Sequence, residues 1–457
     1  MPKIRSFDVF DTLFARRYIN NDSLLHTMEK RYDIPNFYNA RKAADTGTRS
    51  LQEIYQALCD QGVISHDKLD LLLKAEIALE RETIFPIKEN IEKVRDGDLL
   101  ISDMYMSGPD ILSLTRSVGM DKQVTIYQSN SGKASGRIWQ ELQGLDLEYH
   151  IGDNLNSDYN RPVSAGFPAV HYTHSTVHTD IEQYFHSNGL QHLALMIREI
   201  RIKSHTPGYE EFLELANQGN LSFLFFTCEM LHRKYPGKKL AFLGRDCQLM
   251  YKLYNHYYEP AYYVPFSRIV ALQQPVAAAD YLLSQIPKDC ILVDISSTGK
   301  TWEKMCEFHP FNIEVLLYVK TFKYSKERPV LPETFSYITT TDDVISNQII
   351  EVFNCGDHGH LKSITTISGI PVAEYGEPEL KKEIVDVIHI PVNEAICLSK
   401  FYNVRGNLSE LSDSDLFNVF SAVLKYICSS TKINDSVGDY YKLENEYLKE
   451  VKSAANS

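Results

Sequence analysis

The chain has 457 residues, of which 44% are hydrophobic and 23% are charged, the usual balance for a soluble globular protein. This length exceeds what a single hydrophobic core usually organises, so we expect two domains. The formal net charge of -13 argues against a broad surface for a nucleic acid polymer, although a local basic patch could still hold a small phosphorylated substrate.

Several features indicate a cytoplasmic protein without a membrane partner. The opening residues, MPKIRSFDVFDTLF, carry acidic side chains where a signal peptide needs its apolar stretch. The most apolar stretch, residues 221–228, is less than half as long as a membrane span. The eight cysteines form no CxxC pair, so we expect reduced and mostly buried thiols.

The first 185 residues alternate short apolar segments with helical patterns, which predicts an α/β domain built on a Rossmann-like parallel sheet. Between the first two strands, about residues 15–90, apolar residues recur at three- and four-residue spacing. We expect this insert to form a helical cap over an active site. The expected strands are residues 4–7, 99–102, 124–127, 147–151 and 169–172.

Residues 186–457 show a second alternation of strand and helix patterns, which predicts a second α/β domain with a helical C-terminal part. Helices are expected to begin at Gln248 and Thr301, and two more are expected over residues 409–428 and 438–453. The expected strands are residues 239–243, 290–295 and 313–318.

Two carboxylates, Asp8 and Asp11, follow the first expected strand in the segment SFDVFDTLF. The carboxyl ends of parallel strands are where open α/β sheets bind ligands. One carboxylate there can attack phosphorus and form an acyl phosphate, which divides one difficult displacement into two easier ones. A second carboxylate can protonate the leaving oxygen and later accept a proton from water.

Four further polar residues follow later expected strands and fit the same chemistry. Ser102 can donate a hydrogen bond to a phosphoryl oxygen, and Lys133 can neutralise charge on the transferred group. Asp153 and Asp158 can supply oxygen ligands to Mg²⁺. Taken singly, each residue also fits a structural role, as a strand-end hydroxyl, a solvated lysine or a helix cap.

In chain order, FDVFDT, LLISD, a downstream lysine and GDNLNSD resemble the four motifs of the haloacid dehalogenase superfamily of phosphohydrolases. The resemblance covers residues 4–160 and implies that Asp8 is the nucleophile. It implies that Ser102 binds the phosphoryl group, that Lys133 balances charge and that Thr12, the motif threonine, contributes to substrate binding. The implied Mg²⁺ ligands are Asp8, the backbone carbonyl of Phe10 and Asp153, with Asp158 as a further carboxylate on the metal side.

One position departs from this pattern. Phosphatases of the superfamily carry their acid/base aspartate two residues after the nucleophile, where this chain has Phe10. Asp11 comes one residue later, and a shift of one residue redirects a side chain considerably. Asp11 therefore stays a candidate, beside His26 and Tyr105 as conceivable proton donors from elsewhere in the domain.

A second motif, CILVDISSTGKT at residues 290–301, runs from an apolar strand into a polar turn. It resembles the phosphoribosyl-diphosphate loop of type I phosphoribosyltransferases, with Val293 in place of the first of two acidic residues. A Ser/Thr-rich helix cap would explain the same pattern. The residues expected to bind substrate are Asp294, Ser297, Thr298, Gly299, Lys300 and Thr301.

Other polar residues near this motif are weaker candidates. Arg245, Asp246, Ser267 and Arg268 also follow strand-like segments and could line the same pocket, although ion pairing would explain the arginines equally well. The segment CGDHGH, residues 355–360, crowds metal-capable side chains, but a polar loop is the simpler interpretation.

The sequence therefore predicts a Mg²⁺-dependent phosphohydrolase or phosphotransferase that acts through an aspartyl intermediate. The expected substrate is a phosphorylated sugar or nucleotide-related metabolite, and the enzyme would be joined to a phosphoribosyltransferase-like domain. The alternative is a regulatory protein that binds a phosphorylated ligand without turnover, because Phe10 and Val293 each stand where a family pattern has a carboxylate.

Overall fold

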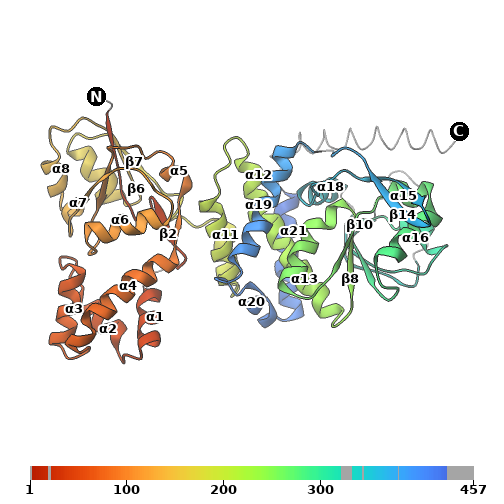
Figure 1. Ribbon diagram of the computed structural model, residues 1–457, viewed down its shortest axis with the longest axis horizontal. Helices are drawn as coiled ribbons and strands as arrows, with labels where there is room; N and C mark the ends of the chain where they lie inside the picture. Colours follow the sequence, from red (N-terminus) through yellow and green to blue (C-terminus); the bar gives the residue numbers. More distant parts are fainter. Residues whose placement is uncertain (1–2, 19–21, 321–331, 342–343, 379, 430–457) are drawn as a thin grey trace. The chain divides into compact units, whose positions relative to one another are not determined.

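The computed structural model describes residues 3–18, 22–320, 332–341, 344–378 and 380–429 (Figure 1). The chain divides into two compact units. The first comprises Met1–Gln183 and Arg201–His205, and the second comprises Tyr184–Ile200 and Thr206–Ser457. The expected boundary at residue 185 lies close to the observed division. No helix in the described part of the chain has both the length and the apolar character needed to cross a membrane.

The first unit is built on a five-stranded parallel sheet with the order β5-β4-β1-β6-β7, which confirms the predicted α/β class. The central strands are buried along most of their length, as expected for a parallel sheet covered on both faces. The strands are β1 (Ile4–Phe7), β4 (Leu99–Ser102), β5 (Thr125–Gln128), β6 (Leu147–Gly152) and β7 (Ala169–His171).

The helical insert of the first unit begins and ends on a short antiparallel pair, β2 (Phe14–Arg16) and β3 (Ile84–Pro86). Its helices form a separate group at one end of this unit (Figure 1). Inside the insert, Arg41 donates two hydrogen bonds to the buried carboxylate of Glu76, at 2.8 and 3.1 Å. The helices are α1 (Asp22–Tyr32), α2 (Phe37–Ala44), α3 (Leu51–Asp60), a 3₁₀ turn (His66–Lys68) and α4 (Leu69–Thr83).

The remaining helices of the first unit connect the strands of its sheet, and the chain then enters the second unit through α10 and α11. They are α5 (Lys88–Ile91), α6 (Gly108–Ser117), α7 (Gly132–Ser135), α8 (Arg137–Glu141), a π-helical turn (Leu155–Asn160), α9 (Arg161–Ser164), α10 (Asp180–Ser187) and α11 (Gln191–Lys203).

The second unit contains another five-stranded parallel sheet, with the order β12-β11-β10-β8-β9, and a separate antiparallel hairpin formed by β13 and β14. The first two strands of this sheet along the chain, β8 and β9, are neighbours. The chain then crosses to β10, which lies on the other side of β8. The strands are β8 (Leu240–Leu243), β9 (Tyr262–Val264), β10 (Ile291–Ser297), β11 (Asn312–Val319), β12 (Phe335–Thr341), β13 (Leu361–Ile367) and β14 (Ile370–Tyr375).

The helices of the second unit include a C-terminal group that differs from expectation in two places. The helix expected over residues 409–428 is two helices, because Ser412 caps a new helix after the break at Leu411. The helix expected over residues 438–453 lies outside the described residues. The helices are α12 (Glu210–Glu214), a π-helical turn (Leu215–Asn220), α13 (Leu221–Lys234), a 3₁₀ turn (Arg245–Cys247), α14 (Gln248–Tyr257), α15 (Arg268–Gln273), α16 (Pro275–Gln285), α17 (Lys300–Cys306), α18 (Val344–Phe353), α19 (Lys382–Leu398), α20 (Val404–Glu410) and α21 (Asp413–Cys428).

Candidate functional site

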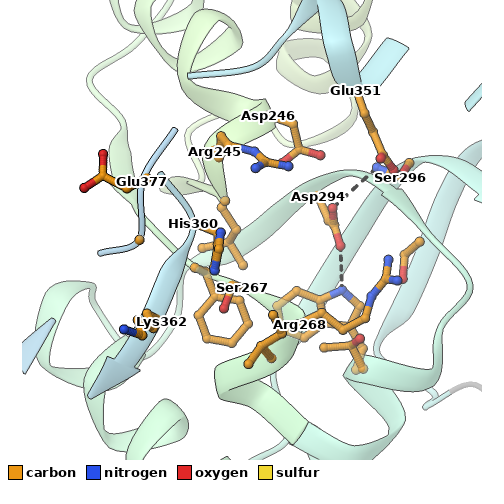
Figure 2. Close-up of a pocket in the computed structure, with 18 residues that line it drawn as sticks. Arg245, Asp246, Ser267, Arg268, Asp294, Ser296, Glu351, His360, Lys362 and Glu377 are labelled. Atoms are coloured by element: carbon orange, nitrogen blue, oxygen red, sulfur yellow. Dashed lines mark hydrogen bonds between the residues drawn. The ribbon is translucent and has the colours of Figure 1, made fainter. Parts of the chain in front are cut away.

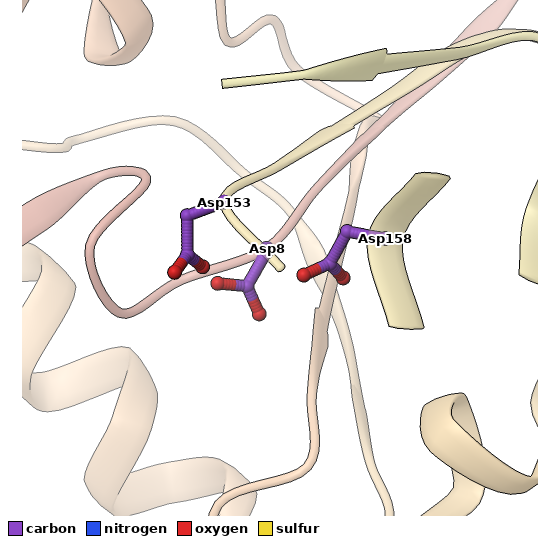
Figure 3. A group of neighbouring side chains, drawn as sticks. All are labelled: Asp8, Asp153 and Asp158. Carbon is purple, nitrogen blue, oxygen red and sulfur yellow. The ribbon is translucent and has the colours of Figure 1, made fainter. Parts of the chain in front are cut away.

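Three aspartates converge at the carboxyl edge of the first sheet. Asp8 directly follows β1, and Asp153 directly follows the neighbouring strand β6. The backbone N–H of Asp8 donates to the carbonyl of Ile151 at 2.8 Å, which extends the hydrogen bonding between these strands as far as Asp8. Asp158 comes from the turn after β6. One carboxylate oxygen of each aspartate lies within 4.8 Å of the others (Figure 3).

Lys133 lies at the same edge and joins two of these aspartates. Its ammonium group donates to Asp158 Oδ1 at 2.7 Å and forms an ion pair with Asp8. The lysine is held by Asp103, which follows β4 and accepts hydrogen bonds from the backbone N–H groups of Lys133 and Ala134, at 2.9 and 3.1 Å. One buried ammonium group is therefore shared by two buried carboxylates, and each group offsets part of the desolvation cost of the others.

His150 contacts the same oxygen of Asp158 as Lys133 does. Its Nε2 lies 3.1 Å from Asp158 Oδ1, and its Nδ1 lies 2.9 Å from the hydroxyl of Ser6 on β1. The other carboxylate oxygen of Asp158 accepts the backbone N–H of Asn154 at 3.1 Å. Asp158 thus has four hydrogen-bond partners, which suits it to positioning Lys133. Asp8 has two, Lys133 and Thr12, so Asp8 and Asp153 are the better candidates for direct contact with a metal ion.

Sequence reasoning missed two of these positioning residues, Asp103 and His150. Neither belongs to a spacing pattern with a chemical meaning of its own. The weak signal for Asp103 was its position directly after the expected strand, in LLISD, next to the candidate Ser102. His150 is a polar residue in the buried end of β6, and such a residue needs a hydrogen-bond partner.

The ionisation of the cluster is uneven. Burial raises the pKa of Asp8 to about 7, against the opposing charge of Lys133. Burial and the charge of Asp8 raise the pKa of Asp153 to about 8. Burial also acts to raise the pKa of Asp158, but the charge of Lys133 and the hydrogen bond from His150 outweigh it and lower the pKa. Asp8 and Asp153 thus hold protons near neutral pH in the absence of a cation, and a set of carboxylate oxygens of this kind could hold a hard divalent cation.

We predict that the affinity of the protein for Mg²⁺ rises between pH 6 and pH 8. A metal ion must displace the protons held by Asp8 and Asp153, so each proton released makes binding about tenfold tighter per pH unit below its pKa. Calorimetric titration with Mg²⁺ at pH 6, 7 and 8, in buffers of different ionisation enthalpy, measures both affinity and proton release. An affinity that stays constant over this range would contradict the prediction.

The same pKa shifts determine how the stability of the metal-free protein should change with pH. For Asp8 and Asp153 the pKa in the folded state is higher than the value of 3.8 for an unperturbed aspartate. The folded state therefore binds more protons than the unfolded state between pH 4 and 8, and the stability contributed by these groups falls as pH rises through this window. Added Mg²⁺ should reverse the loss, because it binds the deprotonated folded state.

Two hydroxyl residues complete this edge. Thr12 donates from Oγ1 to Asp8 Oδ2 at 3.3 Å, which orients the carboxylate. Ser102 ends β4, which is paired in parallel with β1, so its buried hydroxyl lies at the same edge of the sheet as Asp8. The Ser102 hydroxyl accepts the backbone N–H of Met104 at 3.3 Å, and its proton remains available for another acceptor.

The residue at the expected acid/base position, Phe10, belongs to the hydrophobic core. Its ring meets the ring of Phe14 edge to face at 4.7 Å, and the guanidinium of Arg16 lies 4.5 Å from its centroid. Asp11 has a left-handed backbone, with φ 55°. Its charge adds to the effects of burial and Asp8 that raise the pKa of Asp153, and it also acts on Arg16 in β2.

The two other conceivable proton donors, Tyr105 and His26, form contacts with residues of the helical insert. The hydroxyl of Tyr105 donates to Glu76 at 3.1 Å, and burial together with the charge of Glu76 raises the pKa of Tyr105. His26 stacks on Tyr38 in the helical insert, with ring centroids 4.0 Å apart. Of the three candidate acids, Asp11 is the one without such a contact in the described part of the helical insert.

Gly152, the last residue of β6, leaves the space that Asp158 occupies. A Cβ atom at position 152 would lie 2.4 Å from both Cβ and Cγ of Asp158. We expect Gly152→Ala to displace Asp158 from Lys133, lower Mg²⁺ affinity and destabilise the fold by about 1–3 kcal/mol. Gly108→Ala is the matched control, because a Cβ there would make only ordinary contact with Ile126 at 3.6 Å. Equal effects in the two variants, measured by chemical denaturation, would contradict this account.

In the second unit, the expected substrate-binding residues are only partly brought together. A cavity of about 420 Å³ is lined by Asp294, Ser297 and Thr301, together with the weaker candidates Arg245, Asp246, Ser267, Arg268 and His360 (Figure 2). Thr298, Gly299 and Lys300 are not among the lining residues. The helix expected from Thr301 begins one residue earlier, at Lys300.

The segment CGDHGH forms a polar loop within the described structure. Asp357 accepts a hydrogen bond from Gln248 at 2.7 Å, and His358 Nε2 lies 2.6 Å from the hydroxyl of Tyr263. Among the described residues, the group of Asp8, Asp153 and Asp158 is the only cluster of three such side chains arranged closely enough to hold a metal ion.

A search with this sequence finds neither a matching protein-family model nor a matching curated protein.

Proposed function

We propose that the first unit is a Mg²⁺-dependent phosphohydrolase or phosphotransferase of the haloacid dehalogenase type, with Asp8 as the covalent nucleophile. The observation that carries this proposal is the convergence of Asp8, Asp153, Asp158 and Lys133 at the carboxyl edge of one sheet. Further support comes from the order of the motifs, the central position of β1 and the helical insert that follows it.

In the proposed reaction, Mg²⁺ would be held by Asp8, Asp153 and the backbone carbonyl of Phe10, and it would screen the charge of the incoming phosphoryl group. One Asp8 oxygen attacks phosphorus while the bond to the leaving oxygen breaks, which gives an aspartyl phosphate. Lys133 and Ser102 donate to the phosphoryl oxygens. Water then attacks phosphorus, and Asp8 leaves as a carboxylate with release of phosphate.

Asp11 is the proposed acid and base for these two steps. A left-handed residue turns the chain sharply, and this turn offers a physical reason why a carboxylate three positions after Asp8 could reach a site that the superfamily reaches from two positions. Asp11 would donate its proton to the leaving oxygen in the first step and accept a proton from water in the second.

We predict that Asp11→Asn lowers kcat for an alkyl phosphate substrate by about 10²–10³-fold, because proton transfer of this kind contributes on that scale. Asparagine tolerates the left-handed backbone, so the fold should be retained. Mg²⁺ affinity should change little, which steady-state kinetics combined with calorimetry can check. Asp33→Asn is the matched control, since Asp33 also has a positive φ but lies in the helical insert. An unchanged kcat in Asp11→Asn would remove Asp11 from the mechanism.

The function itself is tested by a screen of phosphorylated sugars and nucleotide-related metabolites for phosphate release with Mg²⁺ and with EDTA. Metal-dependent release supports the enzyme. Tight binding of a phosphorylated compound without release would favour the regulatory alternative, which the apolar side chain of Phe10 still supports. A phosphoribosyltransferase-like role for the second unit stays a proposal, supported by the position of Asp294 and Ser297 in a cavity at the edge of its sheet.

A further inference from the structure

The cavity in the second unit lies at the point of its sheet where ligands usually bind. The chain passes from β8 to β9 on one side and then to β10 on the other, so the connections after β8 and β10 leave in opposite directions. In open α/β sheets, the crevice at such a switch point is the common binding site. Residues directly after β8 and β9 and at the end of β10 line this cavity.

One side of the cavity is acidic. Asp246, Asp294 and Glu351 lie together in Figure 2, and they face two guanidinium groups, those of Arg245 and Arg268. Three carboxylates and two guanidiniums leave one negative charge in excess. Burial, with the charges of Asp294 and Glu351, raises the pKa of Asp246 well above its usual value, against the opposing charge of Arg245. Asp246 therefore holds a proton, and a cation bound beside it would take the place of that proton.

Of the three carboxylates, Asp246 has the fewest side-chain hydrogen-bond partners, although the charge of the neighbouring Arg245 acts on it. Asp294 is held by the indole N–H of Trp302 at 2.9 Å and lies near Arg268, whose charge lowers its pKa against the effect of burial. Glu351 accepts the hydroxyl of Ser296 at 2.6 Å. Asp246 accepts no hydrogen bond from the side chain of another described residue, although its carboxylate lines the cavity.

The other side of the cavity carries side chains that can donate to an anion. His360 and Lys362 lie across the cavity from the three carboxylates in Figure 2. Lys362 is exposed and forms no hydrogen bond or ion pair with another described residue. The neighbouring Glu377 is also exposed, so water screens its charge. An ammonium group and an imidazole together suit the double charge of a phosphate.

We propose that this cavity binds a small metabolite that carries both a protonated amine and a phosphate, such as an amino sugar phosphate. The amine contacts Asp246 beside Asp294, and the phosphate contacts Lys362 and His360. A volume of about 420 Å³ is within the range of small-molecule sites and exceeds what a single ion needs. The Phe266 and Trp302 rings, which stack at 5.7 Å and 12°, supply an apolar part of the cavity lining.

Two features favour an amine over a divalent metal ion at the acidic side. The excess charge is a single one, which a monovalent ammonium group neutralises. The three carboxylates also do not form a group close enough for metal coordination, in contrast to the aspartates of the first unit within the described residues. A neutral hydroxyl group could bind at the acidic side, but it would leave the excess negative charge of the cavity without a partner.

The proposal is tested with three probes that differ in one group each: glucosamine 6-phosphate, glucose 6-phosphate and glucosamine. Binding to the full-length chain is measured by calorimetry with EDTA present, so that divalent cations are absent from the first unit. We expect glucosamine 6-phosphate to bind about tenfold more tightly than either other probe, because each of them lacks one charge-assisted contact.

Substitutions separate the two contacts. Asp246→Asn should remove the preference for glucosamine 6-phosphate over glucose 6-phosphate, whereas Lys362→Gln should remove its preference over glucosamine. Asp289→Asn and Lys288→Gln neutralise exposed charges of the same unit outside the cavity and should change neither ratio. Lys362 is exposed, so its variant keeps the test valid if Asp246→Asn does not fold.

Three results would overturn the proposal. The first is that neither phosphate binds, and the second is that glucose 6-phosphate binds as tightly as glucosamine 6-phosphate. The third is that the preferences persist in the Asp246 and Lys362 variants, which would place the binding elsewhere in the chain.

Discussion

Asp8→Asn is expected to abolish Mg²⁺-dependent phosphate release, with a loss on the order of 10⁴-fold or more. An amide oxygen is a poor nucleophile and cannot form the acyl phosphate, while the similar shape of asparagine keeps the contact with Thr12. The metal-free fold should not become less stable. The charge of Asp8 opposes the ionisation of Asp153, so its removal takes away an unfavourable interaction, and Lys133 keeps Asp158 as its ion-pair partner.

The control for this substitution is Asp121→Asn, in which the side chain is 86% exposed and lies outside the cluster. Rates are compared at saturating Mg²⁺, and thermal unfolding is measured with and without the metal. Phosphate release that persists in Asp8→Asn at more than a tenth of the original rate would show that another group carries the reaction. A large loss of stability in the metal-free variant would show that Asp8 has a structural role.

Lys133→Met is expected to lower both activity and stability. The ammonium group is the shared partner of two buried carboxylates, and removal of one member of a buried ion pair typically costs about 3–5 kcal/mol. Burial acts to lower the pKa of Lys133, but the charges of Asp8 and Asp158 outweigh it and raise the pKa, so the lysine remains charged in the folded protein. Chemical denaturation measures the loss.

The effect of Lys133→Met should depend on pH in a defined direction. Without the ammonium group, Asp8 and Asp158 hold protons more strongly in the folded state, so part of the lost stability returns as pH falls toward 5. Lys122→Met, at a partly exposed lysine of the same unit, should change stability by less than about 0.5 kcal/mol. A cost below about 1 kcal/mol for Lys133→Met would contradict the arrangement of charges described above.

Sequence patterns were most informative for strands that are buried on both faces. The strands β1 and β4 have the expected bounds, because continuous apolar runs are required where helices cover both sides of a parallel sheet. The two edge strands of the second sheet were not predicted. The strand β12 is half-buried and rich in serine and threonine, and β9 has only three residues, so neither has a distinctive pattern.

The candidate site could be predicted where one residue directly follows a strand, as Asp8 and Asp153 do. Parallel pairing then brings such residues together without further information. The positions of Lys133 and Asp158 depend on Asp103, His150 and the space at Gly152, which are contacts across the fold. No local pattern encodes these contacts, so they emerge only from the packed structure.

The different environments of Phe10 and Asp11 also could not be read from the sequence and became clear only in the structure. Spacing alone assigns the acid/base position to Phe10, whereas the packing of Phe10 against Phe14 and Arg16 places its ring in the core. The left-handed backbone of Asp11 cannot be inferred from residue type with certainty, since aspartate adopts it only as a minority conformation.

The central claim, a covalent aspartyl phosphate at Asp8, is tested most directly by trapping the intermediate. The Asp11→Asn variant is incubated with Mg²⁺ and acetyl phosphate, quenched in acid and reduced with borohydride, which converts a phosphorylated aspartate to homoserine. Peptide mass spectrometry should find homoserine at position 8 and nowhere else. Homoserine at another aspartate, or none at position 8 while phosphate is released, would contradict the proposed mechanism.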